Sequence, residues 1–137
     1  MIVLDTNVVS ELMRPSPDRR VASWADQQVP AQVVTTAVTV AEIGYGIARL
    51  PAGQRRDLLA LAAAQVFDAF AAGVLPFDAP AAAQYAAVVV ERETAGMPIS
   101  GFDAQIAAIC RRHRARLATR NTADFTALGL DLIDPWG

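Results

Sequence analysis

The chain opens with Met1-Ile-Val-Leu-Asp5-Thr-Asn-Val-Val-Ser10, in which a short apolar run ends on an acid. Apolar residues without alternation predict a strand that is buried on both faces of a sheet. Residues 6–13 follow at once with the apolar spacing of a helix. A buried strand that passes directly into a helix favours a parallel α/β sheet, with Asp5 beyond the carboxyl end of the strand.

The rest of the chain alternates short apolar runs with helical patterns in the same way. Further strands are predicted at residues 32–36, 74–77, 116–119 and 131–133, and helices at residues 18–28, 39–50, 54–72, 80–95 and 100–113, with one helical turn at 121–125. Pro51, Gly73 and Gly96 stand beyond three of these helix ends, as stop signals do. The pattern favours an α/β fold with a parallel sheet covered on both faces, in three layers.

Length and composition bound the class of protein. The 137 residues match the usual size of one domain, so we expect a single domain over residues 1–137. With 53% hydrophobic and 19% charged residues, the composition excludes disorder. The most apolar stretch, residues 58–77, is interrupted by polar residues and a proline, so no membrane span is expected. One cysteine and one histidine exclude an intrachain disulfide and a Cys/His zinc site. We expect a soluble, cytoplasmic protein.

Four of the fourteen acids stand apart from the rest. Asp5 ends the first strand, whereas Glu42, Asp103 and Asp124 each come three residues after a possible helix cap, namely Thr39, Ser100 and Asn121. Helix capping alone can explain acids in a first turn. It does not explain Asp5, which follows a buried strand, or Asp103, which continues the apolar stripe of its helix. A buried lone carboxylate is costly, so both need a partner.

A divalent cation is the natural partner for such acids. If the four converge within about 5 Å, each like-charged pair costs about 3 kcal/mol at an effective dielectric near 20. Oxygen ligands without histidine or cysteine select Mg²⁺ or Mn²⁺ over zinc. Sites of this kind mostly act on phosphates, where the metal activates water.

The arginines add a weaker indication of a phosphate-bearing substrate. The net charge is −2, and five of the twelve basic residues fall in one window, at Arg111, Arg112, Arg114, Arg116 and Arg120. Arg111 and Arg112 suit a helix carboxyl terminus, where cations are favourable. Arg116 and Arg120 are the candidates for substrate binding, because a guanidinium holds phosphate oxygens bidentately.

Four blocks of the sequence resemble the PIN-domain ribonuclease toxins of the VapC family, and most of all their FitB-like branch. The first two are the opening block through Asp5-Thr6-Asn7 and the block Thr39-Val-Ala-Glu42-Ile-Gly-Tyr-Gly. The third is Pro98-Ile-Ser-Gly-Phe-Asp103-Ala-Gln-Ile-Ala-Ala-Ile, and the fourth is Ala118-Thr119-Arg120-Asn121-Thr-Ala-Asp124-Phe125. The blocks occur in order along the whole chain, which is far more specific than Asp-Thr-Asn alone.

The resemblance implies a PIN domain, a three-layer α/β/α sandwich with a mainly parallel five-stranded sheet. It implies cleavage of RNA with Mg²⁺ or Mn²⁺, with Asp5 and Asp103 as principal metal ligands and Glu42 and Asp124 completing the catalytic pocket. The supporting polar groups would be Thr6, Asn7, Thr119 and Asn121. It also implies a toxin that is a homodimer alone and a hetero-oligomer with a cognate antitoxin of the VapB or FitA type.

Two other functions are compatible with parts of the sequence. One is a non-catalytic α/β binding module, in which the acids only cap helices. The other is a phosphatase-like hydrolase with Asp5 as nucleophile, which is disfavoured because Asn7 stands where such enzymes have a second Asp.

The helices carry more apolar side chains than one buried stripe needs. These are Trp24, Leu58, Leu59, Leu61, Val66, Phe67 and Phe70. We therefore expect a groove between the helices at 18–28 and 54–72 that is covered by an antitoxin segment, with a second copy of the chain as the other covering.

Overall fold

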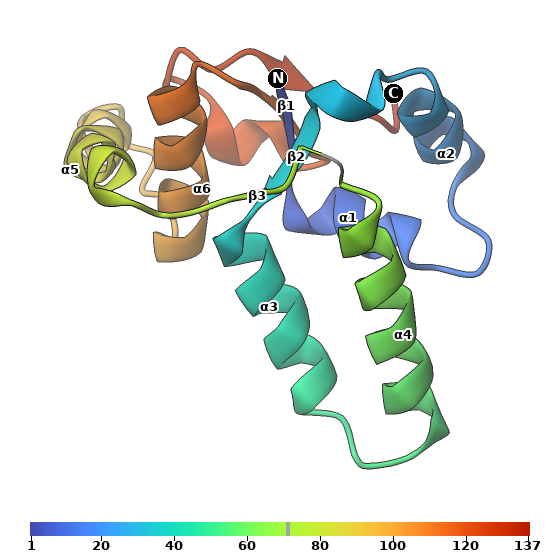
Figure 1. Cartoon of the computed structure of the whole chain (residues 1–137). Helices are drawn as coiled ribbons and strands as arrows, with labels where there is room; N and C mark the ends of the chain where they lie inside the picture. Colours follow the sequence, from blue (N-terminus) through green and yellow to red (C-terminus); the bar gives the residue numbers. More distant parts are fainter. Residues whose placement is uncertain (71) are drawn as a thin grey trace.

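A computed structural model describes residues 1–70 and 72–137, and its centre is a parallel sheet (Figure 1). Over these residues the sheet has five strands in the order β3-β2-β1-β4-β5, and all four neighbouring pairs are parallel. The strands are β1 (Ile2–Leu4), β2 (Val33–Thr36), β3 (Val74–Leu75), β4 (Arg116–Ala118) and β5 (Leu132–Ile133). The predicted α/β class and the parallel five-stranded sheet are confirmed.

The helices lie close to their predicted places. They are α1 (Thr6–Leu12), α2 (Arg19–Asp26), α3 (Ala37–Ala48), α4 (Gln54–Asp68), α5 (Ala79–Thr94) and α6 (Gly101–His113), with 3₁₀ turns η1 (Pro30–Gln32) and η2 (Thr122–Phe125). The helix predicted at 54–72 ends at Asp68, and residue 71 of that prediction lies outside the described residues. In the described part of the chain no helix is long and apolar enough to cross a membrane.

Helices cover the sheet on both faces, which gives the predicted three layers. Val3 points into one buried cluster, where side chains of α5 and α6 pack on the sheet. The neighbouring residues Ile2 and Leu4 point into a second cluster, formed with α1, α2 and α4. Figure 1 shows α5 and α6 on one side of the strands, α1 and α2 on the other, and α3 and α4 extending from the sheet as a pair.

Helix α6 is the central support of the site described below. The Ser100 side chain caps its amino terminus by accepting from the backbone N–H of Asp103 at 3.2 Å, as the sequence predicted. Its stripe of Ile106, Ala107 and Cys110 is fully buried. The helix is therefore fixed against the sheet, and Asp103 is held in its first turn.

Truncation of the α6 stripe should show how much the core depends on it. We expect Ile106→Ala to lower the free energy of unfolding by about 2–5 kcal/mol, because a fully buried side chain leaves a cavity. Leu61→Ala on α4 is the control, since Leu61 is 56% exposed and its loss should change stability by less than about 0.5 kcal/mol. Urea unfolding of both variants measures the difference, and equal losses would contradict this assignment of the core.

Candidate active site

The predicted acids gather where the strand order changes direction. From the central strand β1 the chain moves outward to β2 and β3 on one side, and later returns to β4 and β5 on the other. Open parallel sheets bind ligands in the crevice at such a point, beyond the carboxyl ends of the strands. Asp5 directly follows β1 and Thr119 directly follows β4, so both lie at this crevice.

Asp5 is the buried centre of the site, with 5% of its surface exposed. Its Oδ1 accepts from the backbone N–H of Thr6 at 2.8 Å, which caps α1. Its Oδ2 accepts from the Thr119 hydroxyl at 2.8 Å. One carboxylate thus joins the first turn of α1 to the end of β4, across more than a hundred residues of sequence.

A line of threonine hydroxyls leads from β2 to Glu42. The Thr6 Oγ1 donates to Glu42 Oε1 at 2.9 Å, and it also lies 3.0 Å from Thr39 Oγ1. A hydroxyl has one hydrogen, so Thr39 must donate to Thr6 once Thr6 donates to the carboxylate. Thr36 donates in turn to Thr39 at 3.4 Å. The hydrogen bonds therefore run in one direction, from Thr36 through Thr39 and Thr6 to the Glu42 carboxylate, and they orient this carboxylate at the crevice.

The remaining supporting residues tie α1 to the segment after β4. Asn7 Nδ2 donates to Thr119 Oγ1 at 3.3 Å, and Asn7 Oδ1 accepts from the Arg120 backbone N–H at 3.2 Å. Asn121 contributes its backbone N–H, which donates to Thr119 Oγ1 at 3.1 Å. The structure therefore places Thr6, Asn7 and Thr119 around Asp5, while the recorded contact of Asn121 is through its backbone.

Asp103 and Asp124 come from the layer that α5 and α6 form on one face of the sheet. Asp103 is half-buried in the first turn of α6, and Asp124 is exposed in the 3₁₀ turn η2. The Asp124 backbone N–H donates to the Asn121 carbonyl at 3.0 Å. Both acids therefore come from first turns, as their spacing predicted.

The acids influence one another's protonation. Burial raises the pKa of Asp5 from 3.8 to about 6, against the lowering effect of its hydrogen bonds, and the charges of Asp103 and Glu42 raise it further. Burial is also the main cause that raises the pKa of Glu42, with a contribution from Asp103. The pKa of Asp103 is raised by burial and by the charge of Asp124. Asp5, Glu42 and Asp103 are thus close enough to act on one another, and Asp124 acts on Asp103.

The donor set fits a hard divalent cation. Among the described residues the ion-paired acids are Glu11, Asp18, Glu91 and Asp131, so the four acids of the site have no salt bridge. In that same part of the chain, no three possible ligand side chains are gathered closely enough to hold an ion. Carboxylates repel one another when no cation lies between them. Among the described residues the acids therefore act on one another's pKa without forming a closed cluster of metal ligands.

One predicted cap is wrong. The sequence placed Thr39 at the start of a helix with Glu42 in its first turn, but α3 begins at Ala37 and its cap is Thr36. The Thr36 Oγ1 accepts from the Thr39 backbone N–H at 3.1 Å, which puts Glu42 in the second turn. Glu42 therefore does not cap α3, and its contact with the Thr6 hydroxyl explains its position instead.

The arginines between residues 111 and 120 lie at different ends of the sheet. Arg120 directly follows Thr119 beside the acids, and its guanidinium carbon lies 5.0 Å from the centre of the Trp136 ring. Arg116 is at the amino end of β4, where its Nε donates to Asp131 Oδ2 at 2.7 Å. The structure therefore does not bring Arg116 to the acids. Arg111 and Arg112 occupy the last turn of α6, as expected for cations there.

Sequence reasoning did not single out Arg92, although it lies beside the acids. Its positive charge acts against the rise in the pKa of Asp103. A signal was present, because Arg92 continues the stripe of Ala81, Tyr85 and Val88 on α5 with helical spacing. Its sequence neighbours Glu91 and Glu93 are exposed, so the buried position is flanked by charged surface residues.

The chain is similar to known proteins over nearly all of its 137 residues. A family model described as PIN domain matches residues 2–129. The VapC ribonuclease Y4jK of Sinorhizobium fredii (strain NBRC 101917 / NGR234) is 44% identical over 137 residues, which cover 99% of this chain and 98% of that protein. Toxin FitB of Neisseria gonorrhoeae (strain ATCC 700825 / FA 1090) is 40% identical over 137 residues, with 99% of each covered. The crystal structure of FitAcB from Neisseria gonorrhoeae matches with a TM-score of 0.90 at 40% identity, over 99% of both chains.

Removal of the Asp5 charge should stabilise the metal-free protein in a pH-dependent way. Below about pH 3 the carboxyl is protonated in both folded and unfolded chains, so its burial costs little. As the pH rises from about 4 to about 6, the carboxyl ionises in the unfolded chain but not in the folded one, and the full cost of about 3 kcal/mol is present above that pH. Asp5→Asn should therefore gain up to this amount at pH 7.5 and less than about 1 kcal/mol at pH 4, as measured by urea unfolding in chelator.

Asp68→Asn on the exposed end of α4 is the matched control and should change stability by less than about 0.5 kcal/mol at either pH. Mn²⁺ should raise the melting temperature of the wild type more than that of Asp5→Asn, since the ion binds the folded state. A stability gain of Asp5→Asn that is equal at the two pH values would contradict the raised pKa.

Proposed function

The chain belongs to the PIN-domain family, and on this premise we propose that it is the toxin of a toxin–antitoxin pair and cleaves RNA with Mg²⁺ or Mn²⁺. Its full-length relatives named VapC ribonuclease and Toxin FitB support both parts of the proposal. In this proposal the chain acts in the cytoplasm as one PIN domain over residues 1–137.

The proposal rests on the carboxylates that lie close enough to raise one another's pKa where the strand order of the sheet changes direction. Asp5, Glu42 and Asp103 come from three different elements, and each raises the pKa of another or has its own pKa raised by one. Helix capping alone does not require this proximity. A buried Asp5 beside two half-buried acids lowers stability, which serves no purpose in a non-catalytic binding module but is required to hold the metal of a nuclease.

Each residue has a role in this proposal. Asp5 and Asp103 hold the cation, and Glu42 and Asp124 complete the pocket. A bound Mg²⁺ or Mn²⁺ supplies Lewis acidity to the phosphate and lowers the pKa of water. Thr119 and Thr6 fix the orientation of Asp5 and Glu42 through their hydroxyls.

Arg120 is the substrate-binding arginine that the structure supports. It is exposed, directly adjacent to Thr119, and placed by its backbone hydrogen bond to Asn7. The contact with the Trp136 ring limits the positions that its guanidinium can take. In this proposal it binds a phosphate of the RNA next to the one that is cut.

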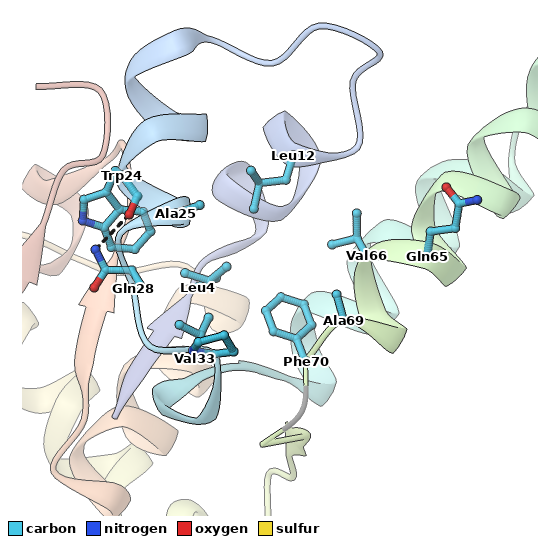
Figure 2. A pocket seen from close by; sticks show the side chains of 11 residues that line it. Leu4, Leu12, Trp24, Ala25, Gln28, Val33, Gln65, Val66, Ala69 and Phe70 are labelled. Atoms are coloured by element: carbon cyan, nitrogen blue, oxygen red, sulfur yellow. Dashed lines mark hydrogen bonds between the residues drawn. The ribbon is translucent and has the colours of Figure 1, made fainter.

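The antitoxin is proposed to occupy the groove between α2 and α4. A pocket of about 350 Å³ lies there, lined by Leu4, Leu12, Trp24, Ala25, Gln28, Pro30, Val33, Gln65, Val66, Ala69 and Phe70. Figure 2 shows the side chain of Trp24, on α2, and that of Phe70, just beyond the end of α4, on opposite sides of it, with Leu4 and Val33 between them. A mostly apolar groove between helices suits an apolar partner segment. Without this partner, the chain is proposed to form a homodimer.

Loss of one metal ligand should abolish cleavage. We expect Asp103→Asn to lower the rate of RNA cleavage by more than about 100-fold, since losses of residues that only support metal ligands already reach that range. The products of the wild type should carry 5′-phosphate and 3′-hydroxyl ends, because water and not the 2′-hydroxyl is the nucleophile. After induction, the yield of new RNA 5′ ends measures the extent of cleavage. The presence of a phosphate on these ends shows which oxygen was the nucleophile.

Asp57→Asn, in the first turn of α4, is the matched control and should cleave like the wild type. Products with 2′,3′-cyclic phosphate ends would overturn the metal mechanism. Full activity of Asp103→Asn would remove the proposed site.

A bulky substitution in the groove should weaken antitoxin binding and leave cleavage intact. Ala69 is exposed and lines the groove, so Ala69→Arg should reduce affinity for the product of the neighbouring gene by about 10-fold or more. Ala64→Arg, also exposed on α4 but outside this groove, should bind like the wild type. Titration calorimetry with the co-purified partner gives the comparison, and equal affinities would exclude the groove.

A further inference from the structure

Arg92 is a buried cation in a layer that is otherwise apolar. It lies near the end of α5 with 4% of its surface exposed. Ala81 and Val88, on the same face, are fully buried. The ion pairs among the described residues do not include Arg92. Burial of a guanidinium without a carboxylate partner is costly, so its contacts need an explanation.

The side-chain hydrogen bonds of Arg92 all go to one short segment, residues 123–126. Its Nη1 donates to the Ala123 carbonyl at 3.2 Å, to the Thr126 carbonyl at 3.0 Å and to the Thr126 hydroxyl at 3.1 Å. These oxygens lie on both sides of Asp124, more than thirty residues from Arg92 in sequence. The guanidinium therefore binds the two ends of the turn that carries the fourth acid.

The other polar contacts of this turn are the Asp124 backbone N–H, which donates to the Asn121 carbonyl at 3.0 Å, and the Thr126 hydroxyl, which donates to the Ala123 carbonyl at 3.1 Å and lies 3.9 Å from Met97 Sδ. The Asn121 side chain does not cap η2, and Asp124 itself is exposed. Just beyond the turn, Ala127 has a φ of 65°, a left-handed conformation that is unfavourable for alanine. The turn is anchored by the buried Phe125 ring and by the Arg92 hydrogen bonds.

Arg92 also acts on the neighbouring helix. Its charge opposes the rise in the pKa of Asp103, so the guanidinium lies near the first turn of α6. Its Nε is buried and has no hydrogen-bond partner within the part of the chain that the structure describes. A buried donor without a partner lowers stability, which an apolar residue at this position would avoid. This arrangement is therefore better explained by a role in the site than by stability.

We propose that Arg92 is a positioning residue that fixes the Asp124 turn beside Asp103, so that both carboxylates are held ready for one divalent cation. The inference rests on the proposed metal-dependent function. Arg92 does not touch substrate or metal in this arrangement, and it acts through the backbone of residues 123–126.

The test uses Mn²⁺ binding to the full-length protein, measured by titration calorimetry without RNA. Arg92→Met should bind Mn²⁺ about 10-fold more weakly than the wild type, as expected when a group that supports a metal ligand is lost. Arg92→Lys should recover part of this loss, because an ammonium can still donate to the turn. Arg112→Met, an exposed arginine in the last turn of α6, is the control and should bind like the wild type.

Hydrogen exchange separates positioning from general destabilisation. In Arg92→Met the backbone amides of 121–126 should exchange faster while those in the centre of α6 remain protected. If Arg92→Met does not fold, Thr126→Val removes one of the three oxygens and should weaken Mn²⁺ binding by a smaller factor.

The outcomes are distinct. A wild type that does not bind Mn²⁺ would refute the proposed function and this inference together. A wild type that binds Mn²⁺, with Arg92→Met or Thr126→Val binding equally well, would leave the proposed function standing and overturn the role of Arg92.

Discussion

The burial of the Asp5 carboxylate at the end of the central strand is the constraint on which the rest of the site depends. An ionised carboxylate that loses its water needs hydrogen-bond donors, and here they are the Thr6 backbone N–H and the Thr119 hydroxyl. Thr119 in turn accepts from Asn7 and from the Asn121 backbone, which fixes the direction of its single hydrogen. The polar residues around Asp5 therefore form one set whose members orient one another.

The topology of the sheet explains why residues so distant in sequence make up this set. β1 lies between β2 and β4, so the segments that follow these strands meet at one edge. Helix α6 packs beneath the same edge and brings Asp103 from the other layer. Because each acid comes from a strand end or from the first or second turn of a different helical segment, the site is complete only when all three layers have formed.

The elements of the fold were predictable because their signals are local. The apolar run before Asp5 and the Ser100 cap of α6 can be recognised from a few neighbouring residues. The cap of α3 could not be assigned in this way, because Thr36 and Thr39 are both suitable caps. The choice depends on where β2 ends, and this is set by the pairing of Thr36 with Leu75 in β3.

The errors in predicting Arg116 and Arg92 also arise because their positions depend on contacts that are distant in sequence. Arg116 is close to Thr119 in sequence, but three residues of extended strand separate them by about 10 Å along β4. It therefore lies at the other edge of the sheet, beside Asp131. Arg92 stands between two glutamates in sequence, and it is buried because the η2 turn packs against α5.

Helix α1 connects the candidate metal site with the candidate partner groove. Thr6 at its start contacts Glu42, while Leu12 at its end lines the groove between α2 and α4. Seven helical residues span about 10 Å. A peptide segment bound in the groove would therefore need to extend by about that distance to reach the acids. Further pockets along Met13 and Arg14 adjoin both places. A basic side chain on such an extension can neutralise the carboxylates that otherwise hold a cation. Under the proposed function, one bound segment could therefore cover the apolar groove and block the metal site at the same time.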